Sequence, residues 1–299
     1  MAEQDVEEVR FDCVLGFTVS DRDVRGRVVR LGPVLDTILQ AHDYPPAIRH
    51  VLAEALVLTA LLGSLLKTKE SQLTLQVQSS SGIVDLLVCD YLQGELRGYI
   101  RHDAEVAARL GNNADLAALF GDAYLAITFD LGETGQRYQG IVPLEGPSLA
   151  SACEGYFFQS EQIPTLIRVA VRSSPGNCQA AGILVQHLPE GEEGGERLHL
   201  RMDDPNWQHV AVIGGSIRHD ELVDPTLTME ALVWRLFHEE QEVKVLPGPA
   251  LVRGCRCSAD YYRSILERFP EKERADMRDT DGAIAVDCAF CSRIFRIDV

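Results

Sequence analysis

Four of the eight cysteines in this chain lie close together near its C-terminal end. Cys255 and Cys257 form a C-x-C pair, Cys288 and Cys291 form a C-x-x-C pair, and 30 residues separate the two pairs. Four thiolates grouped in this way are the usual ligands of a tetrahedral zinc ion. The sequence therefore predicts a metal centre in which these four side chains hold one zinc ion in the reduced protein.

Two structural disulfides are the alternative use of four clustered cysteines. The first five residues are acidic rather than basic and then apolar, so we expect no signal peptide and a cytoplasmic location. Static disulfides are uncommon in a reducing cytosol, which favours zinc. A zinc ion that only stabilises a small domain stays open as an interpretation. The remaining cysteines are dispersed, and we expect them to be packing residues: Cys13, Cys89, Cys153 and Cys178.

The elements that position the four cysteines can be predicted from the sequence around them. β-prone runs flank the C-x-x-C pair, so we expect this pair at the tip of a β-hairpin. A segment rich in acidic and basic residues, with helical character, separates the two pairs. Residues 253–299 are therefore expected to form a small C-terminal zinc-binding domain.

Length and composition limit the class of protein. The chain has 299 residues, more than the usual domain of about 100–200 residues, and 46% of them are hydrophobic. The net charge of −17 argues against nucleic acid as a partner, because such binding needs clustered cations. The longest apolar stretch, residues 51–66, contains Glu54 and is shorter than the roughly 18–20 residues of a membrane span. We expect a buried helix there and no membrane partner.

Residues 1–188 are expected to form an N-terminal α+β domain built on antiparallel sheet. Period-2 runs separated by Gly82 and Gly94 have the pattern of a meander with one face covered by helix. Strands are expected at residues 11–17, 25–31, 72–78, 83–89, 95–101, 124–129, 136–144, 165–171 and 179–186. Helices are expected at residues 44–66, 114–120 and 148–159.

Residues 189–252 differ in composition and are expected to form a metastable, acidic, helical linker. The stretch from His187 to Ala250 holds 5 basic and 13 acidic residues. Acidic breaks are expected at residues 189–196 and 203–206, and helices at residues 207–213 and 228–238. Short apolar helices are marginal alone, so this linker should depend on docking against its neighbours. An ordinary packed connector is the simpler interpretation.

Several longer motifs accompany the cysteine pairs. They are GQRYQGIV at residues 135–142, EGYFFQSEQIPT at 154–165 and RLFHEE at 235–240. With these motifs the chain resembles the 33-kilodalton heat-shock protein family, the redox-regulated bacterial holdase chaperones. The resemblance implies an N-terminal substrate-binding domain, a metastable linker and a C-terminal zinc domain that senses oxidants. The segment around the first cysteine pair is less basic than the family leads us to expect, which leaves the ligands unaffected.

The resemblance implies an ATP-independent chaperone, not an enzyme, whose partners are unfolded or unfolding client proteins. Zinc-bound thiolates are the form that oxidants attack, and a neighbouring thiolate can resolve the sulfenic acid. We therefore expect Cys255–Cys257 and Cys288–Cys291 disulfides, release of zinc, and unfolding of the C-terminal domain and linker. We also consider a homodimer of the oxidised form. The apolar residues expected to be exposed are Val210, Ile213, Leu232, Val233, Trp234, Leu236 and Phe237.

Two other functions are alternatives to the chaperone. A constitutive zinc-stabilised interaction module would keep its zinc in peroxide. A thiol–disulfide oxidoreductase would need its C-x-x-C pair at the start of a helix after a strand, which this sequence does not offer. A zincin-type active site is also disfavoured, because His238 and Glu239 lack a second histidine at the required spacing.

Overall fold

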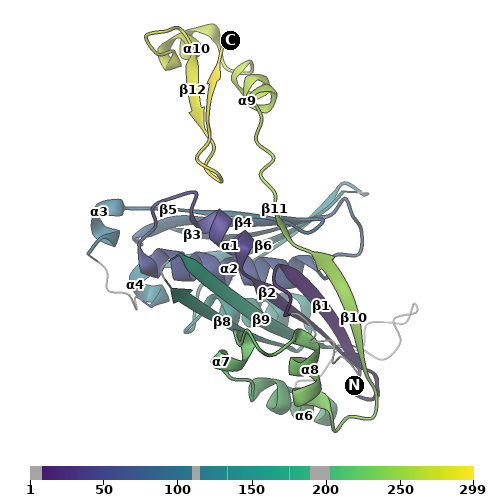
Figure 1. The fold of residues 1–299 in the computed structure, drawn as a ribbon. Coiled ribbons are helices and arrows are strands. Elements are labelled where there is room, and N and C mark those ends of the chain that lie inside the picture. Colours follow the sequence, from purple (N-terminus) through teal and green to yellow (C-terminus); the bar gives the residue numbers. More distant parts are fainter. Residues whose placement is uncertain (1–8, 110–114, 133, 175, 189–202) are drawn as a thin grey trace, which may run out of the picture.

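The computed structural model describes residues 9–109, 115–132, 134–174, 176–188 and 203–299. Two β-sheets enclose a central helix, and a small unit at the C-terminal end stands apart from them (Figure 1). This is the α+β architecture expected from the sequence. The acidic break predicted at residues 189–196 lies outside the described residues. So do the first five residues, on which the expected cytoplasmic location is based.

One sheet, called sheet A here, has five strands in the order β10-β1-β2-β9-β8, and all its neighbouring strands are antiparallel. Its strands are β1 (Cys13–Val19), β2 (Val24–Leu31), β8 (Thr165–Ser174), β9 (Asn177–His187) and β10 (Val243–Ala250). Strand β10 comes from the predicted linker and pairs along β1 from Cys13 opposite Ala250 to Val19 opposite Val243. The sequence pattern of residues 189–252 predicts helices and no strand there, so β10 is a difference from expectation.

The second sheet, sheet B, has six strands in the order β11-β5-β4-β3-β6-β7. They are β3 (Gln72–Ser79), β4 (Val84–Leu92), β5 (Glu95–His102), β6 (Ala123–Leu131), β7 (Gln136–Pro143) and β11 (Val252–Arg253). The predicted β3-β4-β5 meander is confirmed. Gln93 and Gly94 both have positive φ, 54° and 86°, which is the conformation required by a two-residue turn between twisted strands.

Helix α2 (Pro46–Gly63) lies between the two sheets and forms the centre of the main core. Pro46 occupies the first helical turn, where a missing N–H costs nothing. This helix is long and apolar enough to cross a membrane, but 83% of its apolar window is buried inside the protein. The predicted buried helix is confirmed.

Helix α5 (Leu149–Tyr156) continues into a wider turn, η2 (Phe157–Glu161), and packs against β8 of sheet A and β7 of sheet B. Ser148 caps its first turn by accepting a hydrogen bond from the Ser151 N–H. Here two of the sequence motifs meet: a Cβ placed on Gly140 of β7 would lie 1.9 Å from a Tyr156 ring carbon. The remaining short elements are η1 (Ser20–Arg22), α1 (Pro33–Leu39), α3 (Ala104–Ala107) and α4 (Leu116–Phe120).

Three linker helices cover the face of sheet A that points away from α2 (Figure 1). They are α6 (Pro205–Gly215), α7 (His219–Leu222) and α8 (Met229–Phe237). A second hydrophobic cluster joins them to the sheet, with Phe17 and Phe237 at a ring distance of 5.5 Å. The helices predicted at residues 207–213 and 228–238 are confirmed in position, and both are docked.

The C-terminal unit holds helices α9 (Ala259–Leu266) and α10 (Glu271–Met277) and a hairpin of β12 (Ile284–Asp287) and β13 (Ile294–Ile297). The predicted hairpin is confirmed, and its tip points toward sheet B (Figure 1). Within the described part of the chain its buried hydrophobic cluster consists of Leu266, Ile284 and Ile297, with a few partly buried side chains packed against them. Such a core is too small to stabilise a fold of this size without a further constraint.

Candidate metal centre

The structure brings the four predicted ligands together. The sulfur atoms of Cys255, Cys257, Cys288 and Cys291 all lie within 4.8 Å of one another. The Cys255–Cys257, Cys255–Cys288 and Cys257–Cys291 sulfur distances are 3.3, 3.6 and 3.5 Å. A tetrahedral zinc ion with Zn–S bonds of about 2.3 Å requires sulfur–sulfur edges of about 3.8 Å. The thiol set therefore fits zinc, and no cysteine of the chain is in a disulfide.

The first cysteine pair is positioned by the edge of sheet B. The short strand β11 runs parallel to β5, and the Gly254 N–H donates to the Leu96 carbonyl at 2.9 Å. A Cβ on Gly254 would lie 2.3 Å from Glu95 Cβ, so this close approach requires glycine. The residue before Cys255 is thus fixed to the N-terminal body.

The second pair lies in the loop between β12 and β13, called the C-x-x-C loop here (residues 288–291). The Cys288 N–H donates to the Arg293 carbonyl at 2.9 Å, while the Cys288 carbonyl accepts from the Cys291 and Ser292 N–H groups at 3.2 and 2.8 Å. Ser292 has φ 56°, which closes the turn in the left-handed region. The turn holds both sulfurs on the side that faces the first pair.

Hydrogen bonds lower the pKa of one of the sulfurs in the cluster. Burial raises the pKa of the Cys288 thiol, but hydrogen bonds from the Tyr262 hydroxyl and the Phe290 N–H outweigh it and lower the pKa to about 6. Burial, together with the neighbouring thiols, raises the pKa of Cys257, and burial also raises that of Cys255. A cation is therefore needed to hold all the sulfurs as thiolates at neutral pH.

Tyr262 is a site residue that the sequence analysis did not select. It lies on α9, whose first turn is capped by Ser258 directly after the C-x-C pair. Its ring packs on Phe295 at 5.2 Å, and its hydroxyl bonds to the Cys288 sulfur. The sequence signal for Tyr262 was its position one helical turn after the capping Ser258. A side chain there can face the C-x-C pair that comes just before the helix.

The dispersed cysteines are packing residues, as expected. Cys89 and Cys153 are fully buried, and burial raises the pKa of each thiol far above its usual range. Cys178 is also buried and Cys13 is half-buried. None of them approaches the cluster, which is the one group of three or more metal-ligating side chains among the described residues.

The linker presents its predicted apolar face to sheet A. Val210, Leu232, Val233 and Phe237 are buried, whereas the Trp234 side chain is 62% exposed. Ile213 and Leu236 are partly buried against the same cluster. Seven apolar residues are expected from the sequence to become exposed when the linker undocks. In the docked state all of them except Trp234 are covered.

Buried charge reinforces the docking of the linker. The Arg30 guanidinium, 1% exposed on β2, donates to the backbone carbonyls of Leu222 at 3.0 Å and of Leu227. In the β1–β2 turn, Arg22 Nε lies 2.8 Å from Glu240 Oε2, and His209 Nε2 lies 2.6 Å from Glu240 Oε1. Burial opposes ionisation of Glu240, but these two partners outweigh it and lower its pKa.

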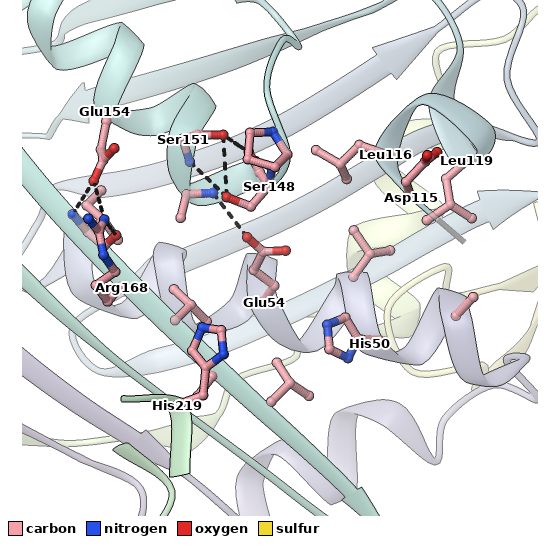
Figure 2. A pocket seen from close by; sticks show the side chains of 18 residues that line it. His50, Glu54, Asp115, Leu116, Leu119, Ser148, Ser151, Glu154, Arg168 and His219 are labelled. Carbon is pink, nitrogen blue, oxygen red and sulfur yellow. Dashed lines mark hydrogen bonds and ion pairs between the residues drawn. The ribbon is translucent and has the colours of Figure 1, made fainter. Parts of the chain in front are cut away.

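The structure also contains a cavity of about 770 Å³ between α2, α5 and β8, with His219 of α7 at its rim (Figure 2). Its carboxylates already have partners within the protein. Glu54 accepts from the Ala150 N–H at 3.1 Å, and Glu154 pairs with Arg168 at 3.0 Å. These groups fasten α5 to α2 and β8, so we assign the cavity no ligand.

The fold and the site together define a class: an α+β protein whose separate C-terminal unit carries a four-cysteine cluster of metal-binding type. Residues 12–298 match the model of the Hsp33 protein family. The 33 kDa chaperonin of Caulobacter vibrioides (strain NA1000 / CB15N) is 39% identical over 295 residues, which cover 96% of this chain and 95% of that protein. The chain therefore belongs to the Hsp33 family, and its function is that of a molecular chaperone.

Two further likenesses agree with this assignment. The 33 kDa chaperonin of Escherichia coli O17:K52:H18 (strain UMN026 / ExPEC) is 36% identical over 268 residues, 90% of this chain and 86% of that protein. The crystal structure of the 33 kDa chaperonin from Thermotoga maritima has a TM-score of 0.78 at 22% identity, covering 96% of this chain and 95% of that chain. The second likeness establishes the shared fold.

Proposed function

We propose that this chain is a redox-regulated, ATP-independent holdase whose four-cysteine cluster holds zinc in the inactive state. The observation that carries the proposal is the four-sulfur cluster on a unit with almost no hydrophobic core. Cys255, Cys257, Cys288 and Cys291 are the proposed ligands. When bound, zinc would hold all four sulfurs as thiolates, the form that reacts with oxidants.

The proposed switch is oxidation of the cluster. Peroxide converts one thiolate to a sulfenic acid and is itself reduced to hydroxide. Attack by the neighbouring thiol on that sulfur then forms a disulfide and releases water. Two such reactions give the proposed Cys255–Cys257 and Cys288–Cys291 disulfides and remove all four metal ligands. The Cys255 and Cys257 sulfurs lie 3.3 Å apart, which is close enough for the first of these pairings.

Loss of the ligands should unfold the C-terminal unit. Structural zinc contributes about 10–16 kcal/mol in small zinc domains, as much as the roughly 5–15 kcal/mol that stabilises a whole domain. The three-residue buried cluster of this unit cannot compensate for that loss. Disorder that begins at Cys255 adjoins β11 and β10, and β10 connects directly to the docked helices.

Release of the linker would expose the client-binding surface. The apolar residues of α6 and α8 and the outer face of sheet A form one continuous cluster, which would become accessible to unfolded polypeptide. We propose residues 1–188 as the substrate-binding segment, 189–252 as the linker and 253–299 as the sensor. We further propose a cytoplasmic protein that binds clients without catalytic turnover, with a homodimer as the oxidised form and neither nucleic acid nor membrane as partner.

Peroxide treatment at mildly raised temperature tests the proposal. Zinc release should be followed with a chromophoric chelator, thiols should be counted, and light scattering of a heat-unfolding client enzyme should report chaperone activity. We expect zinc release, loss of four thiols and suppression of aggregation to occur together, and a Cys13→Ser variant to behave like the wild type. Equal suppression by the zinc-bound and oxidised forms, with zinc retained, would identify a constitutive interaction module instead.

A further inference from the structure

The C-x-x-C loop is seated on the outer face of sheet B. The Phe290 ring meets the Tyr99 ring edge-on at 4.9 Å, and the Arg97 guanidinium lies 4.1 Å from the centre of the Phe290 ring. Arg97 and Tyr99 are alternate residues of β5, so they project from the same face of the sheet. Phe290 thus occupies a site made by one cation and one aromatic ring.

The Arg97 side chain and the Tyr99 backbone are held in place without Phe290. Arg97 forms an ion pair of 2.6 Å with Asp90, whose side chain is only 5% exposed. The Tyr99 backbone is fixed by antiparallel pairing opposite Val88 of β4. Because the ion pair and the strand pairing lie within sheet B, the site should keep its shape after the C-x-x-C loop departs.

The contacts that seat the loop depend on the folded turn. His42 Nε2 lies 2.9 Å from the Ala289 carbonyl oxygen, and the Ser292 hydroxyl donates to the Ala41 carbonyl at 2.6 Å. Arg256, which lies between the two cysteines of the first pair, donates a hydrogen bond of 2.8 Å to Gln72 Oε1. Each of these contacts comes from a residue next to a proposed ligand, so loss of the metal removes them together.

We propose that Arg97 and Tyr99 form a docking site for an aromatic side chain of an unfolded client, filled by Phe290 in the inactive state. The proposal rests on the proposed function, because the site is vacated when the cluster loses its metal. The bound Phe290 indicates the chemistry that the site accepts, since a guanidinium and an aromatic edge both attract an aromatic ring. Clients would then be gripped on both outer faces of the body, sheet A and sheet B.

Photo-crosslinking locates the site. A full-length chain with Val88→p-benzoylphenylalanine carries the probe beside Tyr99, and the client is reduced, carboxymethylated α-lactalbumin, which is permanently unfolded. We expect crosslinks to residues 288–292 of the same chain in the zinc-bound form, and crosslinks to the client after peroxide. An oxidised protein that suppresses aggregation but forms no client crosslink from position 88 would overturn the proposal.

Substitutions test the chemistry. Arg97→Lys keeps the charge beside Asp90 but loses the planar guanidinium, and Tyr99→Thr keeps a strand-forming residue. Each should reduce capture of α-lactalbumin by the oxidised chain about fivefold. Arg101→Lys, on the same strand and face, is the matched control. Equal capture by all three variants would contradict the proposal.

Two more full-length variants separate this site from the redox switch. Phe290→Ala in the zinc-bound form should give client crosslinks from position 88 without oxidant. A chain with all four cluster cysteines changed to serine lacks the folded loop whatever the oxidant does, and it should also crosslink the client. Client crosslinks in these variants, beside a peroxide-treated wild type that keeps its zinc and captures no client, would sink the redox switch and support the site. A peroxide-treated wild type that releases zinc and suppresses aggregation, with no client crosslink from position 88 in any of these proteins, would sink the site alone.

Discussion

The Nε atom of Arg30 on β2 donates a hydrogen bond of 3.0 Å to the backbone carbonyl of Leu222 in the linker. The same guanidinium reaches the Leu227 carbonyl, so one side chain of sheet A binds the last residue of α7 and a residue just before α8. Burial lowers the pKa of Arg30, and the linker carbonyls provide the hydrogen bonds that a buried cation requires. Docking of the linker thus depends on charge as well as on apolar contact.

Arg30→Met should release the linker without oxidation. The substitution removes hydrogen bonds from a charged group, worth about 1.5–3 kcal/mol each, while it retains much of the apolar volume. We expect the zinc-bound variant to suppress client aggregation and to show faster hydrogen exchange in α7 and α8. Arg137→Met on the exposed edge strand β7 is the control. A zinc-bound Arg30→Met protein as inactive as that control would refute the role of Arg30.

Tyr262→Phe should weaken metal binding. The hydroxyl donates to the Cys288 sulfur, and outer hydrogen bonds of this kind change metal affinity by about 10–100-fold. Competition with a chromophoric chelator measures the change. Tyr261→Phe removes the hydroxyl of the adjacent, more exposed ring and should leave the affinity unaltered. Matching affinities for the two variants would remove Tyr262 from the site.

Removal of the metal by a strong chelator under reducing conditions should unfold the C-terminal unit and leave the main core folded. The described cluster of Leu266, Ile284 and Ile297 is separate from the main core around α2. We expect fast hydrogen exchange in residues 255–299 and continued protection of α2, β3 and β4. Protection of the hairpin after chelation would show that the unit is stable without metal.

Acid should undock the linker through Glu240. Its pKa is lowered in the folded protein, so its contribution is fully present above the ordinary carboxyl value of about 4.3 and is lost as the pH falls through the lower folded value. In a Trp234→Phe background, emission of the buried Trp207 should shift to the red below about pH 4.

The matched variants for this titration are neighbours in sequence. Glu240→Gln should weaken docking at neutral pH and flatten the acid transition, because the amide cannot pair with Arg22. Glu239→Gln should behave like the background protein. An acid transition that is identical in both variants would assign the effect to other groups.

Gly140→Ala should destabilise the N-terminal body. The added methyl group would lie 1.9 Å from the Tyr156 ring, and overpacking of this kind costs about 1–3 kcal/mol. Thermal denaturation followed by circular dichroism should show a lower Tm. Gly155→Ala lies on α5, where the new Cβ would meet only Gln159 Nε2 at 4.0 Å, and it should raise the Tm slightly. A Tm for Gly140→Ala at or above that of the wild type would be inconsistent with this packing.

Periodicity and spacing predicted most of this fold. The apolar run of α2, the alternating strands of sheet B and the hairpin around Cys288 all carry local signals, and the structure agrees with them. Strand β10 could not be predicted from the sequence, because Pro247, Gly248 and Pro249 interrupt its alternating pattern. Its pairing partner, β1, lies at the other end of the chain. Such a strand is defined by its neighbour rather than by its own residues.

The candidate ligands could be chosen from spacing alone, whereas their surroundings could not. The bond from Tyr262 to Cys288 and the seating of Phe290 on Tyr99 both join segments distant in sequence. Trp234 also could not be placed from the sequence. The apolar pattern of its helix predicts that it docks, but its side chain lies in solvent. Tertiary packing decides which side of an apolar helix is covered.

The pairing of β10 with β1 also has a consequence for biosynthesis. Cys13 lies opposite Ala250, so the edge of sheet A is completed only when the chain beyond residue 250 has left the ribosome. Until then β1 carries an open edge, and the pairing that closes it spans most of the chain, which makes it slow to form. The nascent protein therefore passes through a stage in which its own unpaired strand needs protection from aggregation.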